Sequence, residues 1–266
     1  MVGISKDIGI GFSTYGKAIS FIFRHNLWWF FAFPILFNII IFWTGIEFKE
    51  YITEIINTKI LGATGLDTAD FFLSDFLKGT VSWIIGISFS IIFFFVFTYF
   101  GGYIVLIAMS PILAYLSEKT EKIYTGKDYP LSAEQLMRDI FRGILIAIRN
   151  MSIEFAYMLA LLIIGFMPFI GWFFSIIGSF FLFFVSSYFY GFSFMDYSNE
   201  RKRLNISKSV QLIRAHKSLA IVNGGIFSLS LIIPFCGVSL SGFFAIVSVV
   251  AASLAMTEVY QIDNIK

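Results

Sequence analysis

Residues 155–195 read FAYMLALLIIGFMPFIGWFFSIIGSFFLFFVSSYFYGFSFM, and none of these 41 residues is Asp, Glu, Lys, Arg or His. About 20 consecutive apolar residues are enough to cross the hydrocarbon core of a bilayer as a helix. The block is therefore long enough for two passes or for one overlong helix. A run this apolar does not suit a water-soluble fold, so it predicts an all-α integral membrane protein.

Three more blocks lack charged residues and histidine: 26–46, 79–117 and 218–257, with 21, 39 and 40 residues. Of all 266 residues, 58% are hydrophobic and only 14% are charged. This charged fraction is about half of that in soluble domains. Because the blocks recur from end to end and no linker divides them, we predict a single membrane domain over 1–266.

Basic residues between the blocks predict the orientation, because Lys and Arg in short loops favour the cytoplasmic side. Segment 47–78 has three basic and six acidic residues, whereas 118–154 has six basic residues and 196–217 has six basic and two acidic ones. We predict an external loop at 47–78, a cytoplasmic helical segment at 118–154 and a basic cytoplasmic loop at 196–217. The N-terminus is then cytoplasmic as well.

The same orientation constrains how often each block crosses the membrane. Block 79–117 joins opposite sides, so we predict one long span, and 26–46 is the other full span. Block 155–195 begins and ends on the cytoplasmic side. It is therefore either a full helical hairpin or one that enters the membrane and returns. Block 218–257 is predicted to be a second hairpin of the same kind.

Proline and glycine mark the centres of both predicted hairpins. Residues 168–171 read PFIG and residues 234–237 read PFCG. Proline lacks a backbone donor and glycine adopts turn conformations easily, so the two together are typical of a chain reversal. The pattern indicates two related hairpins, whose tips we place at Pro168, Gly171, Pro234 and Gly237.

Two segments outside the blocks have distinctive helical faces. Residues 1–25 mix apolar residues with Lys and Arg, which predicts an amphipathic helix at the membrane interface or packed on the cytoplasmic face of the domain. Arg138, Arg142 and Arg149 are spaced four and seven residues apart, so they share one face of a helix. We expect this face to meet lipid headgroups or an anion.

Composition and motifs argue against several functions. A net charge of +2 does not provide the basic surface of a nucleic-acid-binding protein. Cys236 is the single cysteine, and the two histidines, His25 and His216, lie at block edges. A metal cluster or a His-assisted nucleophile is therefore not indicated. We predict no enzyme activity, no cofactor and no metal, with the lipid bilayer as a partner.

Five short motifs follow one another along the chain. They are 33–38 (FPILFN), 110–121 (SPILAYLSEKTE) with Gly126 closing it, 167–171 (MPFIG), 195–197 (MDY) and 233–235 (IPF). In these motifs, their order and their spacing, the chain resembles the CysZ family of bacterial sulfate permeases. The eukaryotic relatives of that family are the etoposide-induced membrane proteins.

The resemblance implies two full transmembrane helices, two hairpins that penetrate only partly, and assembly into homo-oligomers. It also implies the bacterial inner membrane as the location and a small inorganic anion, sulfate, as the substrate. The anion would move without ATP hydrolysis by this chain. Protein or a water-lined cavity must then cover the hairpin tips, because lipid does not satisfy unpaired backbone groups.

The chain departs from the family at the residues that bind sulfate. The family has Gly, an apolar residue and one or two Arg shortly before the proline of the first span. At the aligned positions this chain has Asn26, Leu27, Trp28 and Trp29. Indole rings lack the forked donors with which a guanidinium binds an oxyanion, and they are typical of an aromatic belt at the membrane interface. Arg24 and His25 are the candidate substitute cations.

Four polar residues at or near the block edges are candidates for a permeation route or vestibule: Asn38, Glu118, Glu121 and Arg149. The alternative is structural, with solvated charges at helix ends and an inter-helix hydrogen bond from Asn38. Two functions stay open. The first is a permease for a small anion, and the second is a non-transporting scaffold or lipid-organising protein of the same fold. The lack of charge inside the blocks favours the second.

Overall fold

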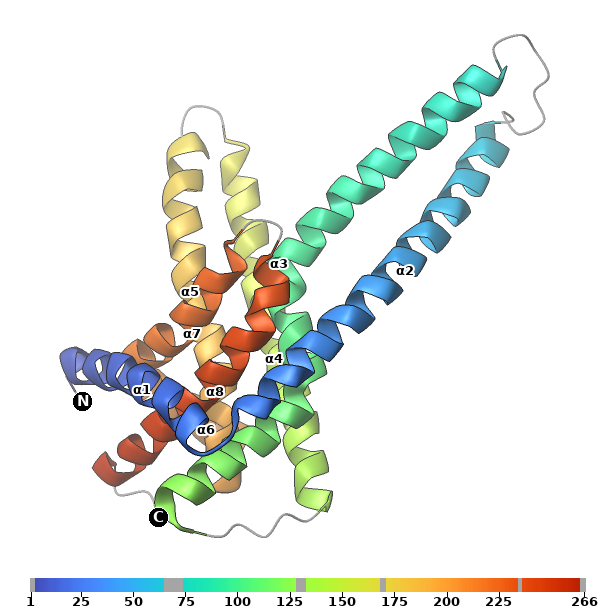
Figure 1. Cartoon of the computed structure of the whole chain (residues 1–266). Helices are drawn as coiled ribbons and strands as arrows, with labels where there is room; N and C mark the ends of the chain where they lie inside the picture. Colours follow the sequence, from blue (N-terminus) through green and yellow to red (C-terminus); the bar gives the residue numbers. More distant parts are fainter. Residues whose placement is uncertain (1–2, 65–73, 128–132, 168–170, 234–235, 264–266) are drawn as a thin grey trace. The chain divides into compact units, whose positions relative to one another are not determined.

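Helices form all the regular structure in the computed structural model, which describes residues 3–64, 74–127, 133–167, 171–233 and 236–263 (Figure 1). They are α1 (Ile4–Arg24), η1 (Trp28–Phe31), α2 (Ala32–Thr64), α3 (Ser74–Thr125), α4 (Ala133–Gly165), α5 (Gly171–Arg201), α6 (Ile206–Ala215), α7 (Lys217–Leu231) and α8 (Gly237–Ile262). Within these ranges, four stretches are long and apolar enough to cross a membrane: Phe100–Thr125, Ile140–Gly165, Ile176–Arg201 and Gly237–Ile262. The predicted class, an all-α membrane protein, is confirmed.

Parts of two long helices form a unit of their own, Ile35–Phe100. At about 1.5 Å per residue, the 33 residues of α2 and the 52 of α3 give lengths of about 50 and 78 Å. A bilayer with its headgroups is only about 40–45 Å thick. The structure differs from the loop predicted over 47–78, because α2 continues to Thr64 and α3 begins at Ser74. No proline interrupts 47–64 and its Glu and Lys residues are good helix formers, so these charges extend the helix.

The other unit, Met1–Pro34 with Gly101–Lys266, is built around α5. α5 packs against α4, α7 and α8, and α7 also packs against α8. In Figure 1, α4 and α5 form one antiparallel hairpin, and α7 and α8 form another. Gly191 of α5 and Gly224 of α7 bring two backbones together, because a Cβ atom on either would overlap backbone atoms of the facing helix. Such close contact through small residues is typical of membrane helices.

The two helices of the second hairpin differ in length. With 15 residues, α7 is about 22 Å long, which is less than the hydrocarbon core of about 30 Å. α8, by contrast, is itself a candidate span of 26 residues. The length of α7 therefore favours a hairpin that enters the membrane and returns.

The turns of the two hairpins share their geometry at the described residues. The N–H groups of Gly171 and Gly237 each donate to the carbonyl four positions earlier, at 2.9 Å. A Cβ atom on either glycine would collide with the carbonyl six positions earlier, so only glycine fits both turns. This equivalence supports the predicted relation between the hairpins. Pro168 and Pro234 lie outside the described residues.

Most of the basic segment 196–217 is helical, which differs from the predicted loop. α5 continues to Arg201 and α6 begins at Ile206. Asn205 caps α6, because its side chain accepts a hydrogen bond from the Lys208 N–H at 2.8 Å. Counting charges does not reveal such a cap, although an asparagine before a helical stretch is a known start signal.

α1 packs one face against α7 and α8. Tyr15 on this face donates its hydroxyl proton to the Asn223 carbonyl, and the hydroxyl also lies 2.7 Å from Ser248 Oγ. Burial raises the pKa of Tyr15 well above its ordinary value, so the phenol stays neutral. Large apolar residues are also exposed on α1: Ile4, Ile8, Phe12, Ile19 and Phe23. The helix therefore packs on the domain and has a second apolar face that suits the membrane interface.

His216 connects α1 to the C-terminal end of the chain. Its Nδ1 lies 2.9 Å from Asp7 Oδ1, and its Nε2 lies 3.1 Å from Asp263 Oδ2. The side chains of His216 and Asp7 are both buried. The imidazole thus holds a carboxylate of the N-terminal helix inside the unit.

Replacing His216 with alanine should loosen α1, because the buried Asp7 carboxylate loses its partner. We expect trypsin to cleave after Lys17 faster in His216→Ala than in the wild type, as measured by mass spectrometry of fragments in detergent. Lys217→Ala is the control, since Lys217 is exposed and lies next to His216. Equal cleavage of the three proteins would contradict this role of His216.

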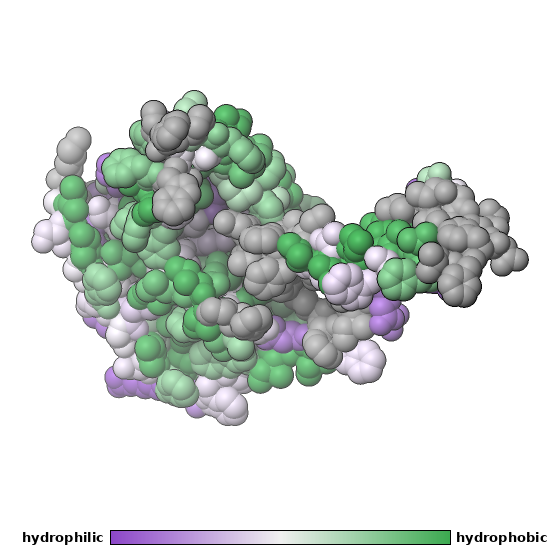
Figure 2. Space-filling model, turned by 90° about the horizontal axis from the view of Figure 1, so that it is seen from above, coloured by the Kyte–Doolittle hydropathy of each residue, from purple (hydrophilic) through white to green (hydrophobic). Residues whose placement is uncertain are grey.

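Apolar side chains occupy much of the surface of each unit. Figure 2 shows green, hydrophobic residues over wide areas of the visible face. Exposed examples are Trp43 of α2, Trp83 of α3, Phe166 next to the first hairpin turn, and Phe180 of α5. Surfaces of this kind suit lipid or another membrane protein chain.

Candidate functional site

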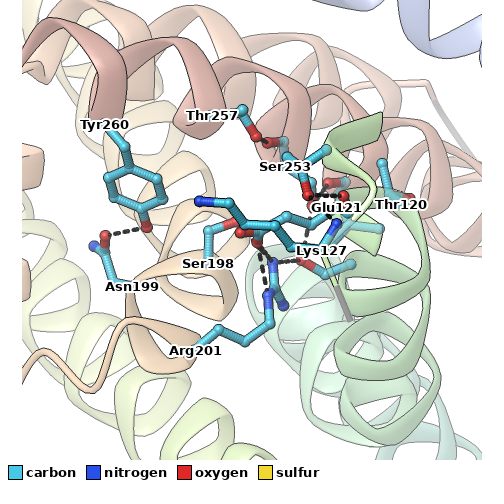
Figure 3. Close-up of polar contacts among 12 residues, drawn as sticks. Thr120, Glu121, Lys127, Ser198, Asn199, Arg201, Ser253, Thr257 and Tyr260 are labelled. Carbon is cyan, nitrogen blue, oxygen red and sulfur yellow. Dashed lines mark hydrogen bonds and ion pairs between the residues drawn. The ribbon is translucent and has the colours of Figure 1, made fainter. Parts of the chain in front are cut away.

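A buried arginine joins α5, α3 and α8 (Figure 3). Arg201 Nε donates to Glu121 Oε2 at 2.8 Å, and Arg201 Nη2 donates to Ser117 Oγ at 2.9 Å and Ser198 Oγ at 3.0 Å. Ser117 Oγ in turn lies 2.7 Å from Ser253 Oγ of α8. The side chains of Arg201 and Glu121 are each only 3% exposed. We call these five residues the buried arginine cluster.

One nitrogen of the Arg201 guanidinium, Nη1, is not used in the described hydrogen bonds. Arg201 Nη1 is buried and has no hydrogen-bond partner among the described residues. A buried donor without a partner costs free energy, and more so when it is charged. A positive charge with several N–H and O–H groups around it is the chemistry that binds a tetrahedral oxyanion. The buried arginine cluster therefore has the donors for such a ligand, with Glu121 as the counter-ion.

Arg142 on α4 has a structural role. Its Nε and Nη2 donate to the two carboxylate oxygens of Asp196 at 2.8 Å each, and its Nη1 donates to the Leu204 carbonyl at 2.5 Å. A carboxylate oxygen of Glu200 lies 3.5 Å from Nε. Our expectation that Arg142 faces headgroups or an anion is wrong, because two carboxylates and a carbonyl already occupy its donors. The bidentate pair with Asp196 ties α4 to α5.

One carboxylate lies near the middle of the candidate span Ile140–Gly165. Glu154 accepts hydrogen bonds from the Tyr103 hydroxyl at 2.5 Å and from the Ser186 hydroxyl. These donors belong to α3 and α5. Carboxylates at membrane depth are costly and persist where protein groups satisfy them. Glu154 thus forms a second polar contact between helices, separate in its residues from the buried arginine cluster.

The positions aligned with the family's sulfate motif follow α1. Asn26 has a φ of 55°, a left-handed conformation that glycine and asparagine adopt most readily. Leu27 is buried, whereas Trp28 and Trp29 are exposed. The nearest cation recorded at these rings is Lys119 of α3, whose Nζ lies 5.7 Å from the Trp29 ring centroid. This arrangement agrees with an aromatic belt, and among the described contacts the cation at these rings is an ammonium group.

The remaining candidates occupy several places. Arg24 and His25 are exposed where α1 ends. Glu118 is buried on α3, three residues before Glu121. Arg149 is half-buried on α4, and Asn38 belongs to the unit Ile35–Phe100. Among the candidate residues chosen from the sequence, Glu121 forms a described ion pair with Arg201.

Sequence reasoning missed Arg201, Ser117 and Ser253. Arg201 opens the run Arg-Lys-Arg, which is typical of a solvated cytoplasmic loop. The serines are small and lie within or at the end of uncharged blocks, where they are unremarkable. A usable signal was present, because Ser117 and Glu121 are four residues apart and therefore share one face of α3.

These features define an all-α, multi-pass membrane protein with charged and hydroxyl side chains buried between its helices. The chain belongs to the family described as sulfate transporter CysZ/etoposide-induced protein 2.4, whose family model matches residues 14–240. Comparison with curated proteins gives no match. The family match confirms the resemblance drawn from the five motifs.

Proposed function

We propose that this protein is a permease for a small inorganic oxyanion, with sulfate as the first substrate to test. The observation that carries the proposal is the buried guanidinium of Arg201, whose Nη1 has no partner in the described part of the chain and which has serine hydroxyls at hydrogen-bond distance. Membership of a family described as sulfate transporters supports it.

Arg201 would take the role that the missing arginines of the first-span motif have in the family. A guanidinium presents five N–H donors in a fixed plane, and sulfate accepts through four oxygens. Glu121 neutralises Arg201 when no anion is bound. An arriving anion would bind Nη1 and the Ser198 hydroxyl while Glu121 keeps the guanidinium in place.

The proposed setting is the bacterial inner membrane, with the N-terminus in the cytoplasm and several copies assembled together. The exposed apolar residues of α2, α3 and the first hairpin turn support a covering by lipid or by further copies. The excess of basic residues in 118–154 and 196–217 supports a cytoplasmic location for the parts of these segments that lie outside the candidate spans.

Uptake of radiolabelled sulfate into proteoliposomes tests the proposal. The purified full chain should admit sulfate faster than protein-free vesicles of the same lipid, and excess unlabelled sulfate should reduce the uptake of label. Uptake equal to that of protein-free vesicles, with correct insertion verified by protease protection, would overturn the permease. That result would favour the scaffold or lipid-organising protein.

The natural cysteine allows a test of the proposed topology. Cys236 is exposed in the turn between α7 and α8, and α7 is too short to carry this turn across the membrane. We expect a membrane-impermeant maleimide to leave Cys236 unlabelled from either side, whereas a permeant maleimide labels it. A cysteine replacing the exposed Thr58 in a Cys236→Ser background should react from outside. Labelling of Cys236 from outside would show that the hairpin crosses fully.

A further inference from the structure

The residues of α1 fall on three faces of the helix. One face packs on α7 and α8 and carries the buried residues, among them Asp7 and Tyr15. Residues three, four or seven positions apart share a face of a helix, and two such series lie outside the packed face. One is an apolar face and the other a basic face. The apolar face consists of Ile8, Phe12, Ile19 and Phe23, and the basic face of Lys6, Ser13, Lys17, Ser20 and Arg24, all exposed.

The exposed charge of α1 is entirely positive. Asp7 is the single acidic residue of the helix, and it is buried. Lys17 pairs with Glu258 of α8 at 3.0 Å. Within the described ranges, no carboxylate is recorded at ion-pair distance from Lys6 or Arg24. The basic face therefore has positive charge at both ends without a protein counter-ion, which attracts an anionic partner.

Two contacts with α8 show how α1 is turned. The Tyr15 hydroxyl lies 2.7 Å from Ser248 Oγ, and Lys17 Nζ lies 3.0 Å from Glu258 Oε1. Ser248 and Glu258 are ten residues apart, which is about 15 Å along a helix. The basic face thus points toward the C-terminal end of α8, where the candidate span Gly237–Ile262 ends. The apolar face is turned away from that end.

This orientation is that of a helix lying in the membrane interface. Such helices bury an apolar face at the boundary between headgroups and acyl chains and keep Lys and Arg among the headgroups. Trp28 and Trp29 follow α1 and are exposed, and tryptophan is enriched at this same level of the membrane. Basic residues at the surface of a bilayer attract anionic lipids.

We infer that the basic face of α1 binds the phosphate headgroups of anionic phospholipids, while its apolar face lies among acyl chains. Lys6 and Arg24 supply the charges that have no recorded protein counter-ion, and the exposed hydroxyls of Ser13 and Ser20 supply further donors. Lys6 and Arg24 are 18 residues apart, or about 27 Å along the helix, so they contact different lipid molecules. Lipid binding does not require transport, so this inference stands apart from the proposed permease.

Native mass spectrometry of the full chain with phosphatidylglycerol and phosphatidylcholine tests the binding. The wild type should bind phosphatidylglycerol in preference, and Lys6→Gln/Arg24→Gln should bind it about 5-fold more weakly for each charge removed. Lys59→Gln/Arg138→Gln is the matched control, because it removes the same charge from exposed positions on α2 and α4. This control should bind as the wild type does. Equal phosphatidylglycerol binding by the wild type and Lys6→Gln/Arg24→Gln would overturn the inference.

Spin labels on neighbouring residues test the depth of the two faces. In a Cys236→Ser background, a nitroxide is attached to a cysteine replacing Phe12 or Ser13 in proteoliposomes. Position 12 should be more accessible to oxygen, which dissolves among acyl chains, and position 13 to a water-soluble nickel chelate. Equal access of the chelate to both positions would overturn the inference. Preferential binding of phosphatidylglycerol without sulfate flux would overturn the permease alone.

Discussion

The Glu121→Gln variant is expected to lose about 3–5 kcal/mol of unfolding free energy, because it leaves the Arg201 charge buried without a counter-ion. Arg201→Gln should lose a similar amount by isolating the Glu121 carboxylate. Chemical denaturation of the purified variants in mild detergent measures both losses. The double variant Glu121→Gln/Arg201→Gln should recover most of the loss, because exchanging both partners of a buried pair for neutral groups is often close to neutral.

An exposed ion pair provides the comparison for these variants. Arg138 and Glu134 are one helical turn apart on α4, 3.7 Å from each other, with side chains 59% and 83% exposed. Removing such a surface pair changes stability by about 0–1 kcal/mol. Equal, small losses in Glu121→Gln and Glu134→Gln would show that the buried arginine cluster does not hold its charges as described.

Gly191→Ala should destabilise the protein by about 3 kcal/mol or more, because two helix backbones would have to separate. The new Cβ atom would overlap the Ala220 carbonyl oxygen of α7, and on the facing side a Cβ atom on Gly224 would overlap the Ser187 carbonyl oxygen. Backbone atoms cannot rotate away as a side chain can. The measurement is the same denaturation in detergent, with helix content followed by circular dichroism.

Gly225 is the matched control for this contact. A Cβ atom there would lie 3.7 Å from Ser187 Oγ, an ordinary contact. Alanine also favours a helix over glycine by about 1 kcal/mol. Gly225→Ala should therefore leave stability unchanged or raise it by up to about 1 kcal/mol. A similar loss for Gly191→Ala and Gly225→Ala would contradict the packing of α5 on α7.

The membrane class could be predicted from the sequence because long uncharged blocks have few alternatives in water. The two hairpin turns could be located because proline and glycine together are typical of a chain reversal. The structure explains the glycines, since a Cβ atom on Gly171 or Gly237 would strike a backbone carbonyl. These predictions depend on local chemistry that the sequence displays directly.

Helix ends were harder to predict, because charge is compatible with both loops and helices. Glu47, Glu50 and Glu54 indicated a loop, yet α2 continues through them to Thr64. The role of Arg142 was also hard to predict. Its spacing from Arg138 and Arg149 does not reveal that it binds the carboxylate of Asp196, which is 54 residues away in the sequence. Pairing across such a distance is set by the packing of α4 on α5.

The candidate site was predicted only in part, and for the same reason. Family resemblance drew attention to Asn26, Trp28 and Trp29, where the sequence has no arginine, and to Glu121, which proved to be the partner of Arg201. Arg201 itself lies 80 residues from Glu121 along the chain. Only the meeting of α3, α5 and α8 makes these residues neighbours.

Sulfate flux through the Glu121→Gln/Arg201→Gln variant tests the role of the buried arginine cluster most directly. This variant removes the guanidinium while avoiding an isolated buried charge, so a loss of flux in a folded protein is attributable to the missing donors. We predict uptake into proteoliposomes near that of protein-free vesicles, with an unfolding midpoint close to wild type. Wild-type rates of sulfate uptake by the same folded variant would contradict Arg201 as the anion contact.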